Sequence, residues 1–266
     1  MPEAELHAYY ERDEERDRLA SGLGLVEFLR TTEVITRRLP PTGATIADIG
    51  GGPGRYTDWL VHNGHRVVHR DLVPLHVDHV RAAHGDLVDT AVGDARSLDL
   101  ADASVDAVLL LGPLYHLEQR RDRVTALREA RRIVRPGGYV YAAAISRWAP
   151  RLHGMLIDHV HVKYPPILSM IEEAERSGEM PPVHESAFNG FAHRPEQLRE
   201  ELVDAGFTID GLVCLEGVAF MLGDLAERLA DPDERSLLFD TLRATESVAE
   251  LLGLGPHLLA VGHKLQ

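Results

Sequence analysis

The chain of 266 residues has only one cysteine, Cys214, and few basic side chains relative to acidic ones. A single cysteine excludes a disulfide within the chain. Lysine and arginine number 28 against 42 aspartates and glutamates, which gives a formal net charge of −14. Such a surface repels phosphate backbones, so the bulk charge argues against a nucleic-acid partner.

Long apolar runs are also missing from the sequence. Its apolar stretches are far shorter than a membrane-spanning helix, and its first residues lack the basic start and apolar core of a signal peptide. These absences predict a cytoplasmic protein with no membrane partner. The 15 histidines fall into no zinc-binding spacing, so we expect no metal ion.

Short apolar runs alternate with helical patterns from residue 44 onward. The expected strands cover residues 44–49, 66–71, 87–92, 105–111, 139–145, 207–215 and 257–264. Segments with helical spacing lie between them, for example at 57–63 and 121–134. This alternation indicates a doubly wound α/β fold, in which helices cover both faces of a seven-stranded sheet.

Proline and charge patterns divide the chain into four parts. Residues 1–43 predict an N-terminal helical cap, and residues 44–146 form the first part of the α/β core. Residues 147–194 contain several prolines and histidines and interrupt the alternation, so they predict an insertion on the substrate side. Residues 195–266 return to the core with a helical excursion.

A glycine-rich segment after the first expected strand carries the most chemistry. Residues 48–54 read Asp-Ile-Gly-Gly-Gly-Pro-Gly. Glycine allows a sharp turn and lets a ligand approach the main chain, and the next helix offers unpaired N–H groups to an anionic group. Asp48 could hold a positively charged amino group, whereas it would repel a pyrophosphate. Asp71, which ends the second strand, can accept hydrogen bonds from both hydroxyls of a ribose. It therefore favours a ligand that contains a nucleoside, without distinguishing one such ligand from another.

Together with three later segments, this motif resembles class I S-adenosylmethionine (SAM)-dependent methyltransferases. The later segments are Gly-Asp-Ala at 93–95, Asp-Ala-Val-Leu-Leu-Leu-Gly-Pro-Leu-Tyr-His at 106–116, and the helix-turn-strand from Leu127 to Val140. The resemblance implies a mixed sheet whose last strand is antiparallel, and SAM as the cofactor. The SAM-binding residues that it implies are Asp48, Gly50, Gly51, Gly52, Gly54, Asp71, Leu72, Asp94, Ala95 and Leu111.

Two of these expectations concern particular parts of the cofactor. The resemblance places Asp94 near the adenine amino group. It also implies that the first helix, which carries Tyr10, folds over the cofactor. The alternative for that helix is simple docking of an amphipathic face.

Residues 112–117, Gly-Pro-Leu-Tyr-His-Leu, resemble a bacterial subgroup that includes natural-product tailoring enzymes. His116 follows the fourth strand at the carboxyl edge of the sheet, so it is the candidate general base. The alternative is a histidine that packs against the loop or caps it. Tyr115 is expected beside the acceptor, and Arg147, His153 and His193 of the insertion are candidate substrate residues.

The sequence therefore predicts methyl transfer from SAM to oxygen or nitrogen of a small molecule or short peptide. A non-catalytic SAM-binding protein, an RNA or protein methyltransferase, and an NAD-linked oxidoreductase stay open as alternatives, and Asp48 disfavours the last. The oligomeric state is not predicted. The segment His76-Val77-Asp78-His79 is expected to be a solvated helix face.

Overall fold

The structure is a computed structural model that describes residues 18–183 and 189–266. The core begins with α2 (Gly22–Thr36), β1 (Thr45–Ile49), α3 (Arg55–His62), β2 (Arg66–Asp71), α4 (Pro74–His84), η1 (Gly85–Leu87), β3 (Val88–Val92), β4 (Val105–Leu110), α5 (Pro113–His116), α6 (Arg120–Ile133) and β5 (Val134–Ser146). The expected first helix, with Tyr10, lies outside the described residues.

The second half of the chain adds the insertion and completes the sheet. The insertion holds η2 (Pro150–Met155), α7 (Val160–Lys163), α8 (Ile167–Ser177), β6 (Glu179–Met180) and β7 (Gly190–His193). The chain returns through α9 (Pro195–Asp204), β8 (Thr208–Cys214), η3 (Gly217–Met221), α10 (Leu225–Ala230), α11 (Pro232–Thr245), η4 (Ala249–Leu251) and β9 (His257–His263).

The seven expected strands form one mixed sheet in the order β3-β2-β1-β4-β5-β9-β8. Neighbouring strands from β3 to β5 are parallel. β9 runs antiparallel to both β5 and β8, as the resemblance implied. The sheet therefore has the α/β arrangement that the sequence predicted.

Two short strands were not expected, and both belong to the insertion. β7 pairs in parallel with the last residues of β5, where Ile145 lies opposite Ala192 and Ser146 opposite His193. Pairing of β4 with β5 ends earlier, at Ala142, while β9 occupies the other edge of β5. The insertion therefore returns to the sheet just beyond the carboxyl end of β4.

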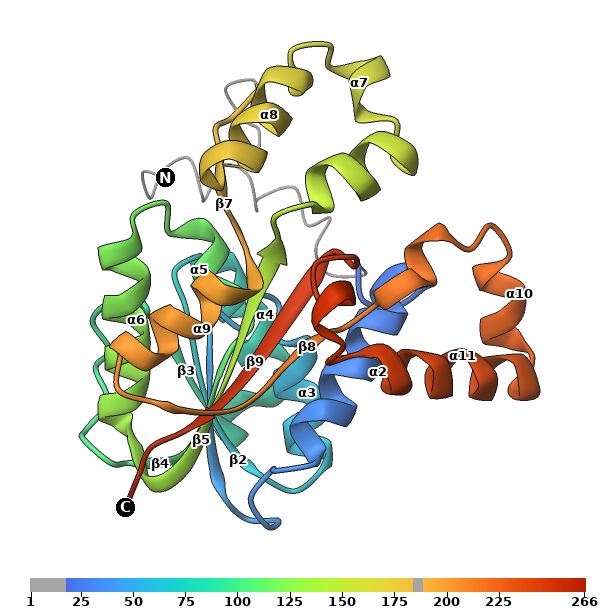
Figure 1. Cartoon of the computed structure of the whole chain (residues 1–266). Helices are drawn as coiled ribbons and strands as arrows, with labels where there is room; N and C mark the ends of the chain where they lie inside the picture. Colours follow the sequence, from blue (N-terminus) through green and yellow to red (C-terminus); the bar gives the residue numbers. More distant parts are fainter. Residues whose placement is uncertain (1–17, 184–188) are drawn as a thin grey trace.

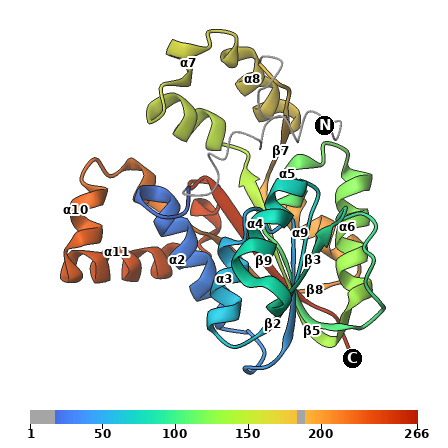
Figure 2. The ribbon, with the colours of Figure 1, turned by 180° about the vertical axis from the view of Figure 1, so that it is seen from behind.

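Helices cover both faces of the sheet (Figures 1 and 2). On one face α6 and α9 contribute buried side chains such as Leu127 and Leu198. On the other face α2, α3 and α4 contribute Ile35, Leu60 and Val80. Each layer buries an apolar helix stripe against the sheet, as a doubly wound fold requires.

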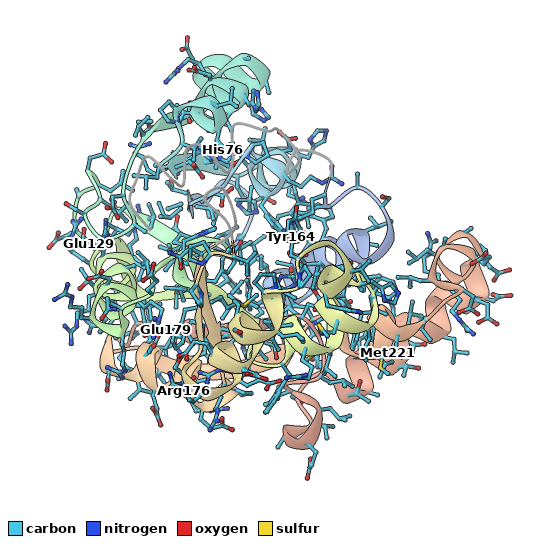
Figure 3. The ribbon with its side chains drawn as sticks, turned by 90° about the horizontal axis from the view of Figure 1, so that it is seen from above. His76, Glu129, Tyr164, Arg176, Glu179 and Met221 are labelled. Atoms are coloured by element: carbon cyan, nitrogen blue, oxygen red, sulfur yellow. The ribbon has the colours of Figure 1, made fainter. Side chains whose placement is uncertain are left out.

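The insertion and the α10–α11 helices project from the core in different directions (Figure 1). Seen from above, Tyr164 of the insertion lies near the middle of the view, and Met221 of η3 lies toward the α10–α11 arm (Figure 3). Both side chains are exposed. Within the described residues, no helix is long and apolar enough to cross a membrane. The division into four parts stays a prediction.

Candidate functional site

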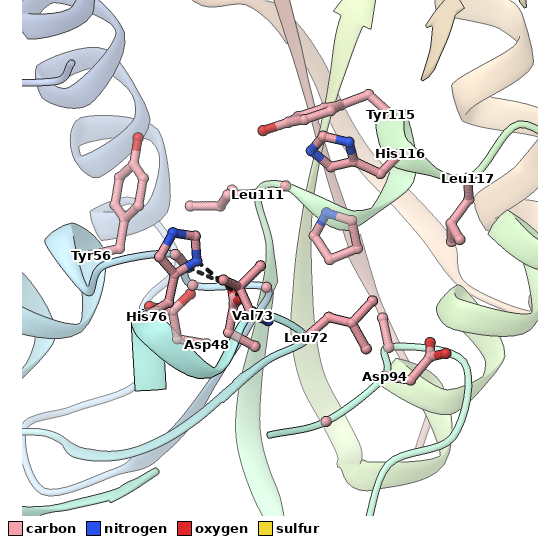
Figure 4. A pocket seen from close by; sticks show the side chains of 18 of the residues that line it. Asp48, Tyr56, Leu72, Val73, His76, Asp94, Leu111, Tyr115, His116 and Leu117 are labelled. Atoms are coloured by element: carbon pink, nitrogen blue, oxygen red, sulfur yellow. Dashed lines mark hydrogen bonds and ion pairs between the residues drawn. The ribbon is translucent and has the colours of Figure 1, made fainter. Parts of the chain in front are cut away.

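A large cavity opens at the carboxyl edge of β1 to β4 (Figure 4). Its empty space is about 1400 Å³, including the open mouth. The predicted residues that line it are Asp48, Gly50, Gly51, Gly52, Asp71, Leu72, Asp94, Ala95, Leu111, Tyr115 and His116. The structure therefore brings together residues from four separate segments, at the edge where α/β sheets of this kind bind ligands.

The glycine loop between β1 and α3 can be built only with small residues. Gly50 and Gly52 have φ values of 66° and 57°, in the left-handed region. A Cβ atom on Gly50 would lie 2.5 Å from Pro113 Cγ, and one on Gly51 would lie 2.7 Å from the Asp48 carboxylate. The bare backbone therefore lets the loop pass close to the carboxylate that ends β1.

Asp48 is buried, with 1% of its surface exposed. Its Oδ2 accepts a hydrogen bond from Thr57 Oγ1 at 2.8 Å, whereas its Oδ1 has no donor among the described residues. Burial raises the pKa of Asp48, and the nearby His69 opposes this. A buried acceptor without a donor is costly, so a ligand with a cationic N–H group would be favoured here.

Asp71 links the glycine loop to the end of β2. Its Oδ2 accepts from the backbone N–H of Gly52 at 2.8 Å, and its Oδ1 accepts from Val73 N–H at 2.8 Å and from His76 Nδ1 at 3.0 Å. Burial opposes ionisation, but the hydrogen bonds from His76 and the backbone lower the pKa of Asp71. Asp71 is therefore an ionised carboxylate with remaining acceptor capacity for ribose hydroxyls.

His76 corrects one expectation from the sequence. Instead of lying on a solvated helix face, it is buried, lines the cavity and donates to Asp71 (Figure 4). The physical reason is local. Pro74 begins α4 three residues after β2 ends, so the first turn of the helix folds back over the carboxylate.

Asp94 lies at the other end of the cavity and is paired within the chain. Both of its oxygens accept from the Arg96 guanidinium, at 3.0 Å from Nε and 2.6 Å from Nη2, and Oδ1 also accepts from the Arg96 backbone N–H. Burial opposes ionisation, but Arg96 lowers the pKa of Asp94. Contact between Asp94 and an adenine amino group stays a prediction.

Tyr115 and His116 form the wall above the glycine loop (Figure 4). Their rings lie 4.8 Å apart between centroids, on the short helix α5 that directly follows β4. Burial lowers the pKa of His116 to about 4, against the opposing charge of Asp71. The imidazole is therefore neutral near pH 7 and able to accept a proton.

The three candidate substrate residues do not line the cavity. Arg147 and His193 are buried, with 2% and 0% of their surface exposed. Arg147 donates to Ala192 O and to Gln197 Oε1, while His193 lies 3.2 Å from a carboxylate oxygen of Glu201.

These contacts give Arg147 and His193 roles in holding the insertion to the core. His153 is half-buried within the insertion, where it pairs with Asp158 and packs against the ring of Phe220. Its role toward a substrate stays a prediction.

Gly54 lies behind the cavity rather than in its lining. It caps α3 with φ of 98°, and a Cβ there would lie 2.7 Å from Val80 Cγ2. Arg55 and Tyr56 follow it and do line the cavity, as do Arg18 and Leu19. Sequence patterns did not predict these four side chains, although the position of Arg55 and Tyr56 directly after the glycine loop could have indicated those two.

The sheet order and the cavity at its carboxyl edge correspond to the Rossmann-like α/β fold of solved SAM-dependent methyltransferases. Residues 47–142 match a family model described as a methyltransferase domain. This segment runs from β1 into β5 and holds most of the cavity lining.

Curated relatives match less than half of the chain. An uncharacterized methyltransferase of Mycobacterium tuberculosis is 37% identical over 106 residues, which is 40% of this chain and 42% of that protein. A probable SAM-dependent methyltransferase of Mycolicibacterium smegmatis is 33% identical over 129 residues, 47% of this chain and 49% of that protein. The chain thus spans less than half the length of these relatives.

Solved structures extend the likeness of fold over nearly the whole chain. A possible histamine N-methyltransferase of Thermotoga maritima has a TM-score of 0.58 and 20% identity, and 97% of each chain is covered. A Burkholderia thailandensis N-methyltransferase, solved with 1,6-didemethyltoxoflavin and S-adenosylhomocysteine, has a TM-score of 0.58 and 17% identity, with 99% of this chain and 88% of that one covered. At such identities the likeness concerns the fold.

Proposed function

We propose that the protein is a SAM-dependent methyltransferase that modifies oxygen or nitrogen of a small molecule or short peptide. One observation carries this proposal above all. Asp48 Oδ1 is buried near the end of β1 and has no donor in the part of the chain that the structure describes, and it lies beside a loop of glycines without side chains. An amino-acid ammonium group satisfies such an oxygen, whereas the pyrophosphate of a dinucleotide would be repelled by it.

The rest of the cavity is consistent with a nucleoside attached to that amino acid. Asp71 presents an ionised carboxylate to ribose hydroxyls, and the lining continues from there to Asp94 and Ala95. SAM supplies a methyl group on a sulfonium. The chain must therefore hold the acceptor in line with that group and exclude water, and positioning of this kind accounts for about 7–11 kcal/mol in well-oriented models.

We assign His116 as the base that accepts the proton lost by the acceptor. It stands at the carboxyl end of β4, lines the cavity, and is neutral near pH 7 because burial lowers its pKa to about 4. Tyr115, whose ring packs on His116, would contact the acceptor from the same side.

The acceptor class rests on the motif at residues 112–117 and on charge. The motif resembles a subgroup with natural-product tailoring enzymes, and the net charge of −14 disfavours a polyanionic substrate. The Burkholderia neighbour is named as the N1-methyltransferase of 1,6-didemethyltoxoflavin. These points support a small-molecule acceptor over a nucleic acid.

A second candidate acceptor is RNA, because one relative favours it. A tRNA carboxymethyluridine methyltransferase of Mus musculus is 30% identical over 133 residues, which is 47% of this chain and 16% of that protein. If RNA were the acceptor, binding would weaken steeply between about 50 and 200 mM salt. Affinity for total tRNA that does not depend on salt, or no affinity at all, would remove this candidate.

The first test is calorimetric titration of the purified protein with SAM, S-adenosylhomocysteine and NAD. The same titrations are made on Asp71→Ala. We expect micromolar binding of both adenosyl ligands to the wild type, loss of that binding in the variant, and no binding of NAD. Binding of NAD alone would overturn the proposal. Turnover of SAM with a panel of acceptors then separates an enzyme from a non-catalytic SAM-binding protein.

A further inference from the structure

A largely buried group of acidic and basic side chains lies beside the cavity, outside the residues discussed so far. Glu27 comes from α2, Glu216 from the segment after β8, and His257 from the first position of β9. One ligating atom of each lies within 4.8 Å of the others. Because His257 pairs opposite Ile145 near the end of β5, the group stands at the carboxyl edge of the sheet.

The contacts run in a line from the cavity into the interior. Arg18, which lines the cavity, donates to both oxygens of Glu27, at 2.5 and 3.1 Å. Glu27 Oε2 lies 3.6 Å from His257 Nδ1. His257 in turn donates from Nδ1 to Glu216 Oε1 at 2.5 Å and from its backbone N–H to Oε2 at 3.1 Å. The exposed fractions of the side chains are 37% for Arg18, 12% for Glu27, 22% for His257 and 0% for Glu216.

The four charges alternate in sign along this line. Burial lowers the basicity of His257, but Glu27 and Glu216 outweigh it and raise the pKa of His257 to about 9. Burial likewise opposes ionisation of Glu27, but His257 and Arg18 lower its pKa. Near pH 7 the order is therefore cation, anion, cation, anion. The two carboxylates are balanced by Arg18 and protonated His257, so the group does not require a metal ion for charge neutrality.

We propose that Glu27, His257 and Glu216 are positioning residues that hold the Arg18 guanidinium at the amino-acid end of the cofactor cavity, where it receives a carboxylate. The inference rests on the proposed function. Arg18 lines the cavity close to Tyr56, since its charge acts on the Tyr56 hydroxyl. Figure 4 shows Tyr56 and Asp94 at opposite ends of the cavity. Since Asp48 offers an acceptor to an ammonium group, a nearby guanidinium complements the carboxylate of the same amino acid.

The alternating order explains why three further side chains are needed to position one arginine. The carboxylate of Glu27 fixes the fork of Arg18 through two hydrogen bonds. His257, as a cation, attracts Glu27 and keeps it from being repelled by Glu216, which anchors His257 through two contacts of its own. Loss of the His257 charge therefore releases Glu27, and loss of the Glu27 charge releases Arg18.

The test compares two ligands on matched variants. S-adenosylhomocysteine contains the amino-acid carboxylate, whereas 5′-methylthioadenosine keeps the adenosine and lacks the amino acid. We expect Glu27→Gln to weaken binding of the first ligand by about tenfold, which corresponds to about 1.4 kcal/mol, and to leave the second within about twofold. Glu33→Gln is the control, because Glu33 lies on the same helix and pairs with Arg30 and Arg243 instead.

A double-variant cycle shows whether Glu27 acts through Arg18. Arg18→Gln should reproduce the loss seen in Glu27→Gln, and the double variant should lose no more than either single one. Additive losses, or equal losses for the two ligands, would overturn the inference. If the wild type binds neither ligand, the proposed function fails instead, so the two failures can be told apart.

A pH series on the full chain tests His257 without relying on the stability of a Glu27 variant. The groups that face His257 among the described residues are Glu27 from α2, Glu216 after β8, and Arg18 before α2. As pH rises from about 7 to about 10, His257 loses its proton, and affinity for S-adenosylhomocysteine should fall.

The comparison for that series is His257→Gln, because the ammonium group of the ligand also titrates in this range. We expect the variant to bind weakly at about pH 7 already and to show a smaller fall than the wild type. Identical profiles would overturn the role of His257. Tight binding of Zn²⁺ that displaces the His257 proton would likewise replace this account with a metal site.

Discussion

Replacement of Asp48 by asparagine should separate the effect of this buried charge on stability from its effect on cofactor binding. The change keeps the shape of the side chain and an oxygen for Thr57, and it removes the charge from a group that is 1% exposed. Because burial raises the folded-state pKa of Asp48 above its unfolded value, the folded protein loses stability as pH rises through that pKa. Near neutral pH the free variant should therefore be at least as stable as the wild type.

The bound state should respond in the opposite direction. If Asp48 Oδ1 receives the ammonium group of SAM, the variant leaves a buried cation without its partner. Removal of one member of a buried charged pair costs about 2–5 kcal/mol, which is roughly a 30-fold to several-thousand-fold loss of affinity. Wild-type affinity should also decrease as pH falls through the folded-state pKa of Asp48, because the protonated carboxyl no longer attracts a cation.

Thermal unfolding with and without S-adenosylhomocysteine measures both effects in one assay. The variant should keep or raise its midpoint when free and lose the ligand-induced increase. The control is Asp106→Asn, an aspartate at the opposite edge of the sheet that accepts from Thr45 N–H and Arg135. It should lower the midpoint and keep the ligand response. An Asp48→Asn protein that is less stable yet binds with wild-type affinity would refute the reasoning.

Other substitutions test separate parts of the site. His116→Ala should lower kcat by about 10²–10⁴-fold while affinity for S-adenosylhomocysteine stays within about threefold; since the pKa of His116 is about 4, this group should contribute no titration to the wild-type rate between about pH 5.5 and 8. Gly51→Ala should weaken cofactor binding by at least about tenfold in calorimetry, because the new Cβ would lie 2.7 Å from the Asp48 carboxylate. Glu201→Gln should reduce the free energy of unfolding in urea by about 3–5 kcal/mol, because Arg123 would stay buried without an anionic partner, while cofactor affinity remains unchanged.

Local patterns were sufficient to predict most of the fold. Apolar alternation placed β2 at residues 66–71 as observed, and the glycine segment located the loop of the cavity. β5 was predicted to begin at 139, yet it begins at Val134, because that residue pairs with Val105 across a register shift. This pairing joins residues that are distant in sequence, so no local pattern around Val134 reveals that β5 begins there.

The same limit applies to the side chains around the cavity. Asp71 is the last residue of β2 and Asp48 the last but one of β1, so their positions follow from the sheet alone. The group that contacts Arg18 joins Glu27 to His257, which is far away in sequence, and no spacing rule connects them. Arg147 and His193 were predicted to contact the substrate because they belong to the insertion. Tertiary packing, which the sequence does not reveal, buries both.

The two ends of the insertion are fastened to each other. The backbone N–H of Arg147, at its start, donates to His193 O at 2.7 Å, and the Arg147 side chain donates to Ala192 O at 2.9 Å. Since closing a longer loop costs little extra entropy, the residues between these points are free to diverge in length and sequence. A change in the length of this module would therefore leave the carboxyl edge of the sheet, and the cofactor cavity in it, with the same shape.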